Sequence, residues 1–324
     1  MERKTFTNKE GEDFSYLVHQ SEGSSKNFVF FHATGFNSET YKILFDKLLS
    51  HYDNEINIYA LDQRGHGLSA AKSNPDELKT WDVFVRDGEE FIESVSGTVI
   101  LSGHSMGSII AAKIASLKPR KVSHLFMIEP VLYGPMESLK FRLKSLLRIN
   151  RELAIAGGAA KRRRNFSSID EAVTSYTGRG AFTTWSQEWI ENYLKGGTQK
   201  TESGIELSCS PNWEAATFRS SSMDTWRYIK KIKMNVKVVY GSIGSTFSSQ
   251  AREALFKIGP NWNSNYYKEA SHFLPMEYTD SIIKDLEKKI GKIVLSSNQT
   301  LIWDTLKQIN YDNKVEGYGE LFKS

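Results

Sequence analysis

Residues 103–107 read Gly-His-Ser-Met-Gly and place a serine between two glycines. Ser105 follows the apolar run Val99–Ser102 and precedes the apolar run Ile109–Leu117, which is typical of a buried strand leading into a helix. A strand-to-helix turn this tight needs small neighbours, and the two glycines provide them. Such a turn exposes the hydroxyl at a sheet edge and aims a helix N-terminus at it. The pattern therefore predicts a nucleophilic serine.

A serine hydroxyl is a weak nucleophile and needs a base that accepts its proton during attack. The candidate base is His272, which lies between a strand-like segment at Asn265–Lys268 and a helix predicted over Pro275–Lys289. This places the histidine on a loop at the same sheet edge as the serine. The other six histidines belong to tight turns or strand ends, or have no motif around them.

Strand-like segments alternate with helix-like segments, which predicts an α/β fold with a mostly parallel sheet and helices on both faces. The predicted strands are Phe28–Phe31, Ile56–Leu61, Val99–Ser102, Leu125–Ile128, Val236–Tyr240 and Asn265–Lys268. The predicted helices are Tyr41–Leu49, Glu77–Val95, Ile109–Leu117, 249–258 and Pro275–Lys289.

The alternation stops between residues 134 and 233. We therefore expect a core of residues 1–133 and 234–291, an inserted helical cap at 134–233, and a C-terminal extension at 292–324 of unassigned role. The extension either packs on the core or contacts a second subunit in a homodimer. Within the insertion, one predicted helix face carries Leu139, Leu143, Leu146 and Asn150.

The insertion is basic, with 17 lysines and arginines against 10 acidic residues, although the whole chain carries a net charge of only +4. Its densest run, Lys161–Arg164, is interpreted as a solvated surface, with an anion-docking surface as the alternative. The large aromatic residues are interpreted as the insertion's own core, with a lid over the site as the alternative. They are Phe166, Tyr176, Phe182, Trp185, Trp189, Tyr193, Trp213, Phe218 and Trp226.

Four motifs in this order resemble the α/β-hydrolase family over residues 25–290. They are Phe31–Phe36, Asp62–Gly67, the serine turn and Ser271–Glu277. The resemblance implies an oxyanion hole made by the backbone N–H groups of Thr34 and Met106. His32-Ala33 stands where one family variant has His-Gly. The Asp62–Gly67 motif is interpreted as structural, with Asp62 and Arg64 holding a glycine turn beside the site.

The acid that would orient the histidine departs from the common family pattern. The turn Gly241–Thr246 holds no carboxylate, and glycine stands at position 244, where the family usually has aspartate. In relatives such as haloalkane dehalogenases, the acid follows the strand after the nucleophile helix, and here that place holds Glu129. The resemblance therefore implies a triad of Ser105, His272 and Glu129. The alternative is that Glu129 only forms a structural ion pair. Asp224 is a remote second candidate for the orienting acid.

These residues predict a serine hydrolase that forms an acyl-enzyme, with an ester carrying an apolar portion as the first substrate class. Thioester, lactone and carbon–carbon bond hydrolysis use the same triad and stay open. A non-catalytic small-molecule-binding protein is the hypothesis of another class, and the missing aspartate motivates it. Dehalogenase and epoxide-hydrolase chemistry need an aspartate nucleophile, so the serine excludes them.

No cofactor, metal or nucleic-acid motif occurs in the 324 residues, and no apolar run approaches the length of a membrane span. We expect a small-molecule substrate and no cofactor. The single cysteine, Cys209, excludes an internal disulfide and, with no visible secretory signal, predicts a cytoplasmic location.

Overall fold

The computed structural model describes residues 1–146, 154–220 and 224–290, and the chain divides into two units, Met1–Ile283 and Lys284–Ser324. The first unit contains an eight-stranded sheet with the order β1-β2-β4-β3-β5-β6-β10-β11. The strands are β1 (Glu2–Thr7), β2 (Asp13–His19), β3 (Asn27–Phe31), β4 (Asn57–Leu61), β5 (Val99–His104), β6 (Val122–Ile128), β10 (Asn235–Ile243) and β11 (Trp262–Ser271).

The strands from β4 to β11 in this order run parallel, as predicted. Every residue of β3, β4 and β5 is buried, which is the burial that a parallel strand covered on both faces requires. Two strands were not predicted: β1 and β2 form an antiparallel hairpin, and β2 pairs with β4. The side chains of β1 are exposed or only partly buried, so its sequence lacks the apolar run of a core strand.

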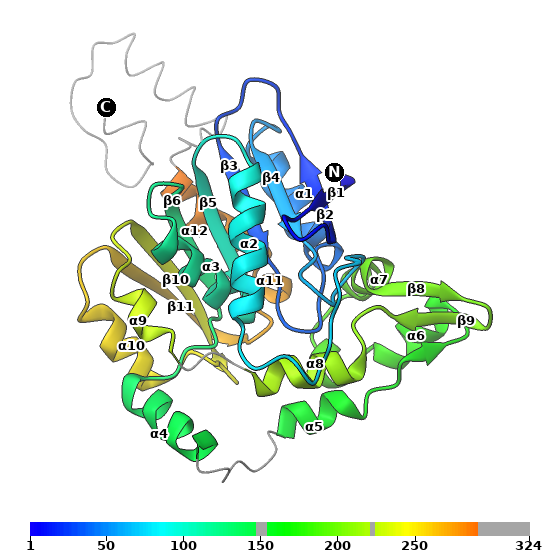
Figure 1. The fold of residues 1–324 in the computed structure, drawn as a ribbon. Coiled ribbons are helices and arrows are strands. Elements are labelled where there is room, and N and C mark those ends of the chain that lie inside the picture. Colours follow the sequence, from blue (N-terminus) through cyan, green and yellow to red (C-terminus); the bar gives the residue numbers. More distant parts are fainter. Residues whose placement is uncertain (147–153, 221–223, 291–324) are drawn as a thin grey trace. The chain divides into compact units, whose positions relative to one another are not determined.

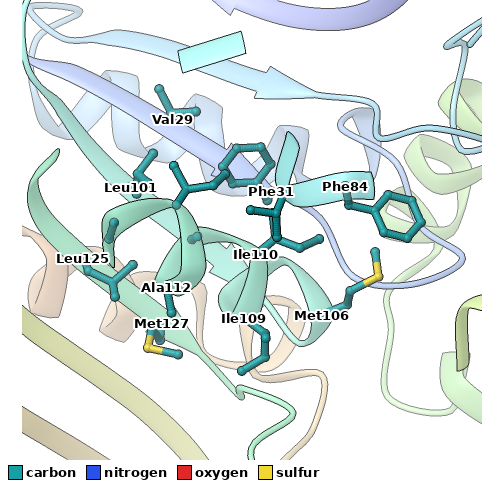
Figure 2. Packing of buried hydrophobic residues seen from close by; sticks show 14 of the residues in the cluster. Val29, Phe31, Phe84, Leu101, Met106, Ile109, Ile110, Ala112, Leu125 and Met127 are labelled. Atoms are coloured by element: carbon teal, nitrogen blue, oxygen red, sulfur yellow. The ribbon is translucent and has the colours of Figure 1, made fainter. Parts of the chain in front are cut away.

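Helices cover the sheet. They are α1 (Lys42–His51), α2 (Asp82–Ser94), α3 (Met106–Leu117), α10 (Ser249–Phe256) and α11 (Leu274–Glu277), with a 3₁₀ turn η1 at Glu39–Tyr41. The helix α12 (Thr279–Ile290) begins in the first unit and ends in the second. In Figure 1, α2 and α3 lie side by side in front of the parallel strands, and α1 lies behind them. Figure 2 shows that Met106, Ile109 and Ile110 of α3 pack between the strands and Phe84 of α2. The helix that carries the serine turn is therefore anchored in the core.

The segment between β6 and β10 is mainly helical. Its helices are α4 (Pro135–Leu146), α5 (Ala154–Ala160), α6 (Ile169–Tyr176), η2 (Gly180–Phe182), α7 (Gln187–Gly197), α8 (Pro211–Arg219) and α9 (Trp226–Ile229). It also contains an antiparallel sheet that was not predicted, formed by β7 (Asn165–Phe166), β9 (Gly204–Leu207) and β8 (Thr198–Thr201). The turn between β8 and β9 needs Gly204, whose φ is 143° and where a Cβ would lie 2.2 Å from the Phe166 carbonyl oxygen.

The predicted apolar face of α4 is not packed into a core. Leu139 and Leu143 are 47% and 50% exposed. The side chain of Leu146, residue Asn150 and the extension at 292–324 lie outside the described residues. Of the helices that the structure describes, none is both long and apolar enough to cross a membrane.

Candidate active site

The serine turn joins β5 to α3 in a conformation that only close packing maintains. Ser105 has φ 56° and ψ −118°, and its N–H donates to the Ile128 carbonyl oxygen at 2.9 Å. A Cβ on Gly103 would lie 2.3 Å from the backbone of Gly107, and a Cβ on Gly107 would lie 2.0 Å from the Phe31 carbonyl oxygen. Both glycines are therefore required by the close approach of β3, β5 and α3.

His272, in the loop after β11, contacts both the serine and a carboxylate. Its Nε2 lies 3.0 Å from Ser105 Oγ, and its Nδ1 lies 3.2 Å from Glu129 Oε2. Because an ionised carboxylate only accepts hydrogen bonds, Nδ1 carries the ring proton and Nε2 is free to accept the proton of Ser105. The structure thus brings together the three residues that the sequence singled out for a triad.

Glu129 follows β6 in a left-handed conformation with φ 45°, and its side chain is fully buried. Its N–H donates to the Val239 carbonyl oxygen of the neighbouring strand β10 at 2.9 Å. Its carboxylate accepts hydrogen bonds from Gly241 N–H and, at 2.9 Å, from Ser245 Oγ. These donors and the imidazole fix the carboxylate in place.

The turn Gly241–Thr246, which lacks the family's usual acid, supplies hydroxyl groups to this arrangement instead. Besides the Ser245 contact, Thr246 Oγ1 lies 3.4 Å from His272 Nδ1 and donates to the carbonyl oxygens of Glu129 and Pro130. Gly244 is exposed, and a Cβ there would meet no atom within 4 Å. The second candidate acid, Asp224, forms an ion pair with Lys113 at 2.7 Å.

The two candidate oxyanion donors stand next to each other. Thr34 Oγ1 donates to the Met106 sulfur at 3.4 Å, and within the described chain neither backbone N–H is used in a protein hydrogen bond. Thr34 lies in the loop after β3, which approaches closely because Gly35 adopts φ 77°. Met106 is the first residue of α3, so its N–H lies at the positive end of the helix dipole.

Two buried side chains that the sequence did not single out hold these loops. His104 Nε2 donates to the His272 carbonyl oxygen at 2.8 Å, so its Nδ1 accepts from the Tyr41 hydroxyl at 2.7 Å. Tyr41 Oη in turn accepts from Ala33 N–H at 3.2 Å. Burial and the neighbouring His272 hold the pKa of His104 well below its ordinary value, so the ring stays neutral. The histidine beside the serine in the motif was the available signal.

The Asp62–Gly67 motif forms a hydrogen-bonded turn beside this site. Asp62 accepts from the N–H groups of Ser38 and Leu68 at 2.7 and 3.0 Å. Arg64 donates to Asp87 through two nitrogens, at 2.8 and 2.9 Å. These contacts fit the structural interpretation of the motif.

A cavity of about 650 Å³ opens onto Ser105 and His272 and is lined by side chains of both the core and the insertion. Its aromatic lining comprises Phe36, Phe166, Tyr176, Phe182, Phe218 and Phe273. Trp185 joins the two parts, because its ring centroid lies 5.2 Å from that of Phe36 and 5.9 Å from that of Phe273. Some rings of the insertion thus line the cavity or pack on the core, and they do not only form a core of their own.

No group of three histidine, cysteine, aspartate or glutamate side chains is arranged to hold a metal ion in the part of the chain that the structure describes. What the arrangement offers is a hydroxyl, a base, a buried acid and two backbone donors around one cavity. This combination is suited to attack on a carbonyl carbon.

Comparison with known proteins agrees with this fold. The family described as serine aminopeptidase, S33, matches residues 23–177. The protein phosphatase methylesterase 1 of Schizosaccharomyces pombe is 28% identical over 148 residues, which are 44% of this chain and 40% of that protein. The (E)-2-((N-methylformamido)methylene)succinate hydrolase of Acinetobacter baylyi is 29% identical over 111 residues, which are 34% of this chain and 40% of that protein.

The chain thus spans about two fifths of the length of these curated relatives. Among solved structures, an E-2-(acetamidomethylene)succinate hydrolase superposes with a TM-score of 0.69 at 21% identity, covering 90% of this chain and all of that chain. This likeness concerns the fold, which is the α/β-hydrolase fold predicted from the sequence.

Proposed function

We propose that this chain, which has the α/β-hydrolase fold, is a serine hydrolase that cleaves a carboxylic ester through an acyl-enzyme intermediate. The observation that carries the proposal is the continuous contact of three groups. His272 lies 3.0 Å from Ser105 Oγ through Nε2 and 3.2 Å from Glu129 Oε2 through Nδ1. Two of the curated relatives are named methylesterases, which supports an ester as the substrate.

In the proposed reaction, Ser105 Oγ attacks the ester carbonyl carbon and His272 Nε2 takes the hydroxyl proton. The carbonyl oxygen becomes an oxyanion that accepts hydrogen bonds from the N–H groups of Thr34 and Met106. Collapse of this intermediate breaks the bond to the alcohol oxygen, which leaves with the proton from His272. A water molecule then attacks the acyl carbon while His272 takes its proton. The bond from the acyl carbon to Ser105 Oγ breaks, His272 returns the proton to Oγ, and the acid is released.

Glu129 stabilises the imidazolium that forms in both steps and holds the proton on Nδ1 between them. The carboxylate is well suited to this because its other contacts are hydrogen-bond donors, Gly241 N–H and Ser245 Oγ. The alternative of a non-catalytic binding protein rested on the missing acid at position 244, and the contact of Glu129 with His272 argues against it.

A fluorophosphonate probe tests the mechanism directly, because it labels only an activated serine. We expect labelling of the wild-type protein and none of Ser105→Ala. A folded wild-type protein that is not labelled would contradict the proposal. The substrate class is then tested with p-nitrophenyl esters, thioesters and lactones, and we expect the highest kcat/KM on esters.

We also propose that the enzyme acts on a small-molecule substrate in the cytoplasm. The cavity of about 650 Å³ beside Ser105 supports the former, and the single buried cysteine, Cys209, supports the latter. Cell fractionation with a fluorophosphonate probe would measure the location of the active protein.

A further inference from the structure

The cavity beside Ser105 carries an excess of positive side chains. Among the described residues, its lining includes three arginines, Arg162, Arg163 and Arg179, but only one acidic residue, Glu214. A purely apolar substrate gives no reason for cations on this wall, because each cation loses hydration when a ligand covers it.

Arg162 is neutralised inside the cavity wall. It forms an ion pair with Glu214 at 2.7 Å and donates to the hydroxyls of Tyr176 and Tyr193. Burial opposes the charged form, but Tyr193 and Glu214 outweigh it and hold the pKa of Arg162 well above its usual range. The Glu214 carboxylate rests on the oxyanion loop, since a Cβ on Gly35 would lie 2.3 Å from its Oε1.

Arg163 is also paired, although with a residue that does not line the cavity. Its guanidinium lies 2.6 Å from Glu171 Oε1, its Nε donates to the Asn165 carbonyl oxygen at 2.7 Å, and it covers the ring of Phe166 at 4.5 Å. Two of the three positive charges are thus balanced by two carboxylates.

Arg179 is left with an unbalanced charge. It is an exposed residue in the turn between α6 and η2, it lines the cavity, and no carboxylate of the described chain pairs with it. Its neighbours Gly178 and Gly180 both have positive φ, and a Cβ on either would meet no atom within 4 Å. Arg179 therefore brings five N–H donors to the cavity lining, and no carboxylate among the described residues neutralises them.

We propose that the substrate is a half-ester of a dicarboxylic acid, with its ester group at Ser105 and its free carboxylate bound by Arg179. This inference rests on the proposed hydrolase function and adds the substrate class. One unbalanced positive charge matches the single charge of a carboxylate better than a phosphate monoester, which carries about −1.5 to −2 at neutral pH. The planar guanidinium also matches two carboxylate oxygens. The apolar chain between the two ends contacts the aromatic lining, such as Phe36, Phe182 and Phe273.

The test compares mono-p-nitrophenyl adipate with p-nitrophenyl hexanoate, because the two acyl chains have six carbons and differ only in the terminal carboxylate. We expect wild-type kcat/KM to favour the adipate ester by about tenfold or more, and the preference to shrink as salt is raised. In Arg179→Gln, the adipate-to-hexanoate ratio falls by about 10- to 100-fold, and Arg179→Lys retains part of it.

The matched control is Arg86→Gln, an exposed arginine outside this cavity that lies 3.9 Å from Glu10. We expect it to keep the wild-type ratio. Wild-type protein that treats both esters alike, or Arg179→Gln that lowers both equally, would overturn the inference while fluorophosphonate labelling still supports the hydrolase. If the protein is neither labelled nor active, calorimetric binding of monomethyl adipate decides. Weaker binding to Arg179→Gln than to wild type supports the anion site, and equal or absent binding refutes it.

Discussion

Glu129→Gln is the sharpest test of the relocated acid, because it changes one atom of the side chain. The carboxylate accepts hydrogen bonds from Gly241 N–H, from Ser245 Oγ and from the Nδ1–H of His272. An amide has one accepting oxygen and one donating NH₂ group, so it cannot accept on both sides. With the NH₂ towards His272, the ring must take the tautomer that carries its proton on Nε2. That tautomer cannot accept the proton of Ser105.

The magnitude follows from these contacts. A hydrogen bond to a charged group contributes about 1.5–3 kcal/mol, and the wrong tautomer removes the base from most molecules. An acid-to-amide change in a serine triad lowers kcat by about 10⁴, which is about 5.4 kcal/mol at 1.36 kcal/mol per decade. We expect Glu129→Gln to lower kcat by about 10³- to 10⁴-fold. Glutamate and glutamine adopt the left-handed backbone at position 129 at the same cost. The main loss of stability is therefore the one hydrogen-bond donor that the amide leaves without an acceptor, about 1–3 kcal/mol.

The assay is kcat on an activated p-nitrophenyl ester, together with the rate of fluorophosphonate labelling, at a temperature where thermal melting shows the variant folded. Ser245→Ala is the matched control, since it removes one neutral donor to the same oxygen and leaves the charge. We expect it to cost no more than about tenfold. A kcat of Glu129→Gln within tenfold of wild type would refute the assignment of this carboxylate as the orienting acid.

Three further predictions follow from particular contacts. Thr246→Asp in the Glu129→Gln background should raise kcat at least about tenfold over Glu129→Gln alone, because Oγ1 of Thr246 lies 3.4 Å from His272 Nδ1. An unchanged kcat would contradict this placement of residue 246 beside the imidazole. Gly107→Ala should lower the free energy of unfolding by more than about 3 kcal/mol or prevent folding, because its Cβ would lie 2.0 Å from a carbonyl oxygen of β3. The control is Gly158→Ala in α5, whose Cβ meets no atom within 4 Å and which should stabilise the protein slightly. Urea denaturation measures both free energies. Burial, helped by a neighbouring histidine, lowers the pKa of His66 to about 3, so below pH 6.5 the unfolded state binds a proton that the folded state does not, and stability falls as pH drops from about 6.5 towards 3. His66→Gln should flatten this slope by up to about 1.4 kcal/mol per pH unit, and an unchanged slope in urea midpoints would contradict it.

The parallel part of the sheet could be predicted because its strands are short apolar runs, buried on both faces and separated by helix-length segments. The hairpin of β1 and β2 could not, because the strand Glu2–Thr7 packs only one face and its charged residues look like a loop. The Asn8–Gly11 turn was the available signal. The sheet in the insertion was missed for the same reason, as β8 carries mostly exposed polar residues.

The candidate site was predictable only as far as local motifs reach. The serine turn and the histidine loop carry their own signals, whereas the contact between Thr246 and His272 depends on the path of a loop. The sequence pointed to position 244 as the place left without its acid, but Gly244 is exposed and open. Arg162 likewise belongs to a run that the sequence predicts to be a solvated basic surface. Its ion-pair partner, Glu214, lies 52 residues away in the chain, so local sequence could not reveal that Arg162 is paired.

An acid that moves from one strand to another can still reach the same imidazole nitrogen, because β6 and β10 are adjacent parallel strands whose ends meet at one sheet edge. The backbone N–H of Glu129 donates to Val239 of β10, so the residue leaves β6 alongside the start of the turn that lacks an acid. Its positive φ is the local strain of this arrangement, and Gly241 and Ser245 of that turn stabilise the carboxylate by donating to it. The turn Gly241–Thr246 therefore does not supply the carboxylate itself, but it donates the hydrogen bonds that hold the Glu129 carboxylate in place. For this reason we expect substitutions of the turn to change how His272 is oriented, and not only how stable the protein is.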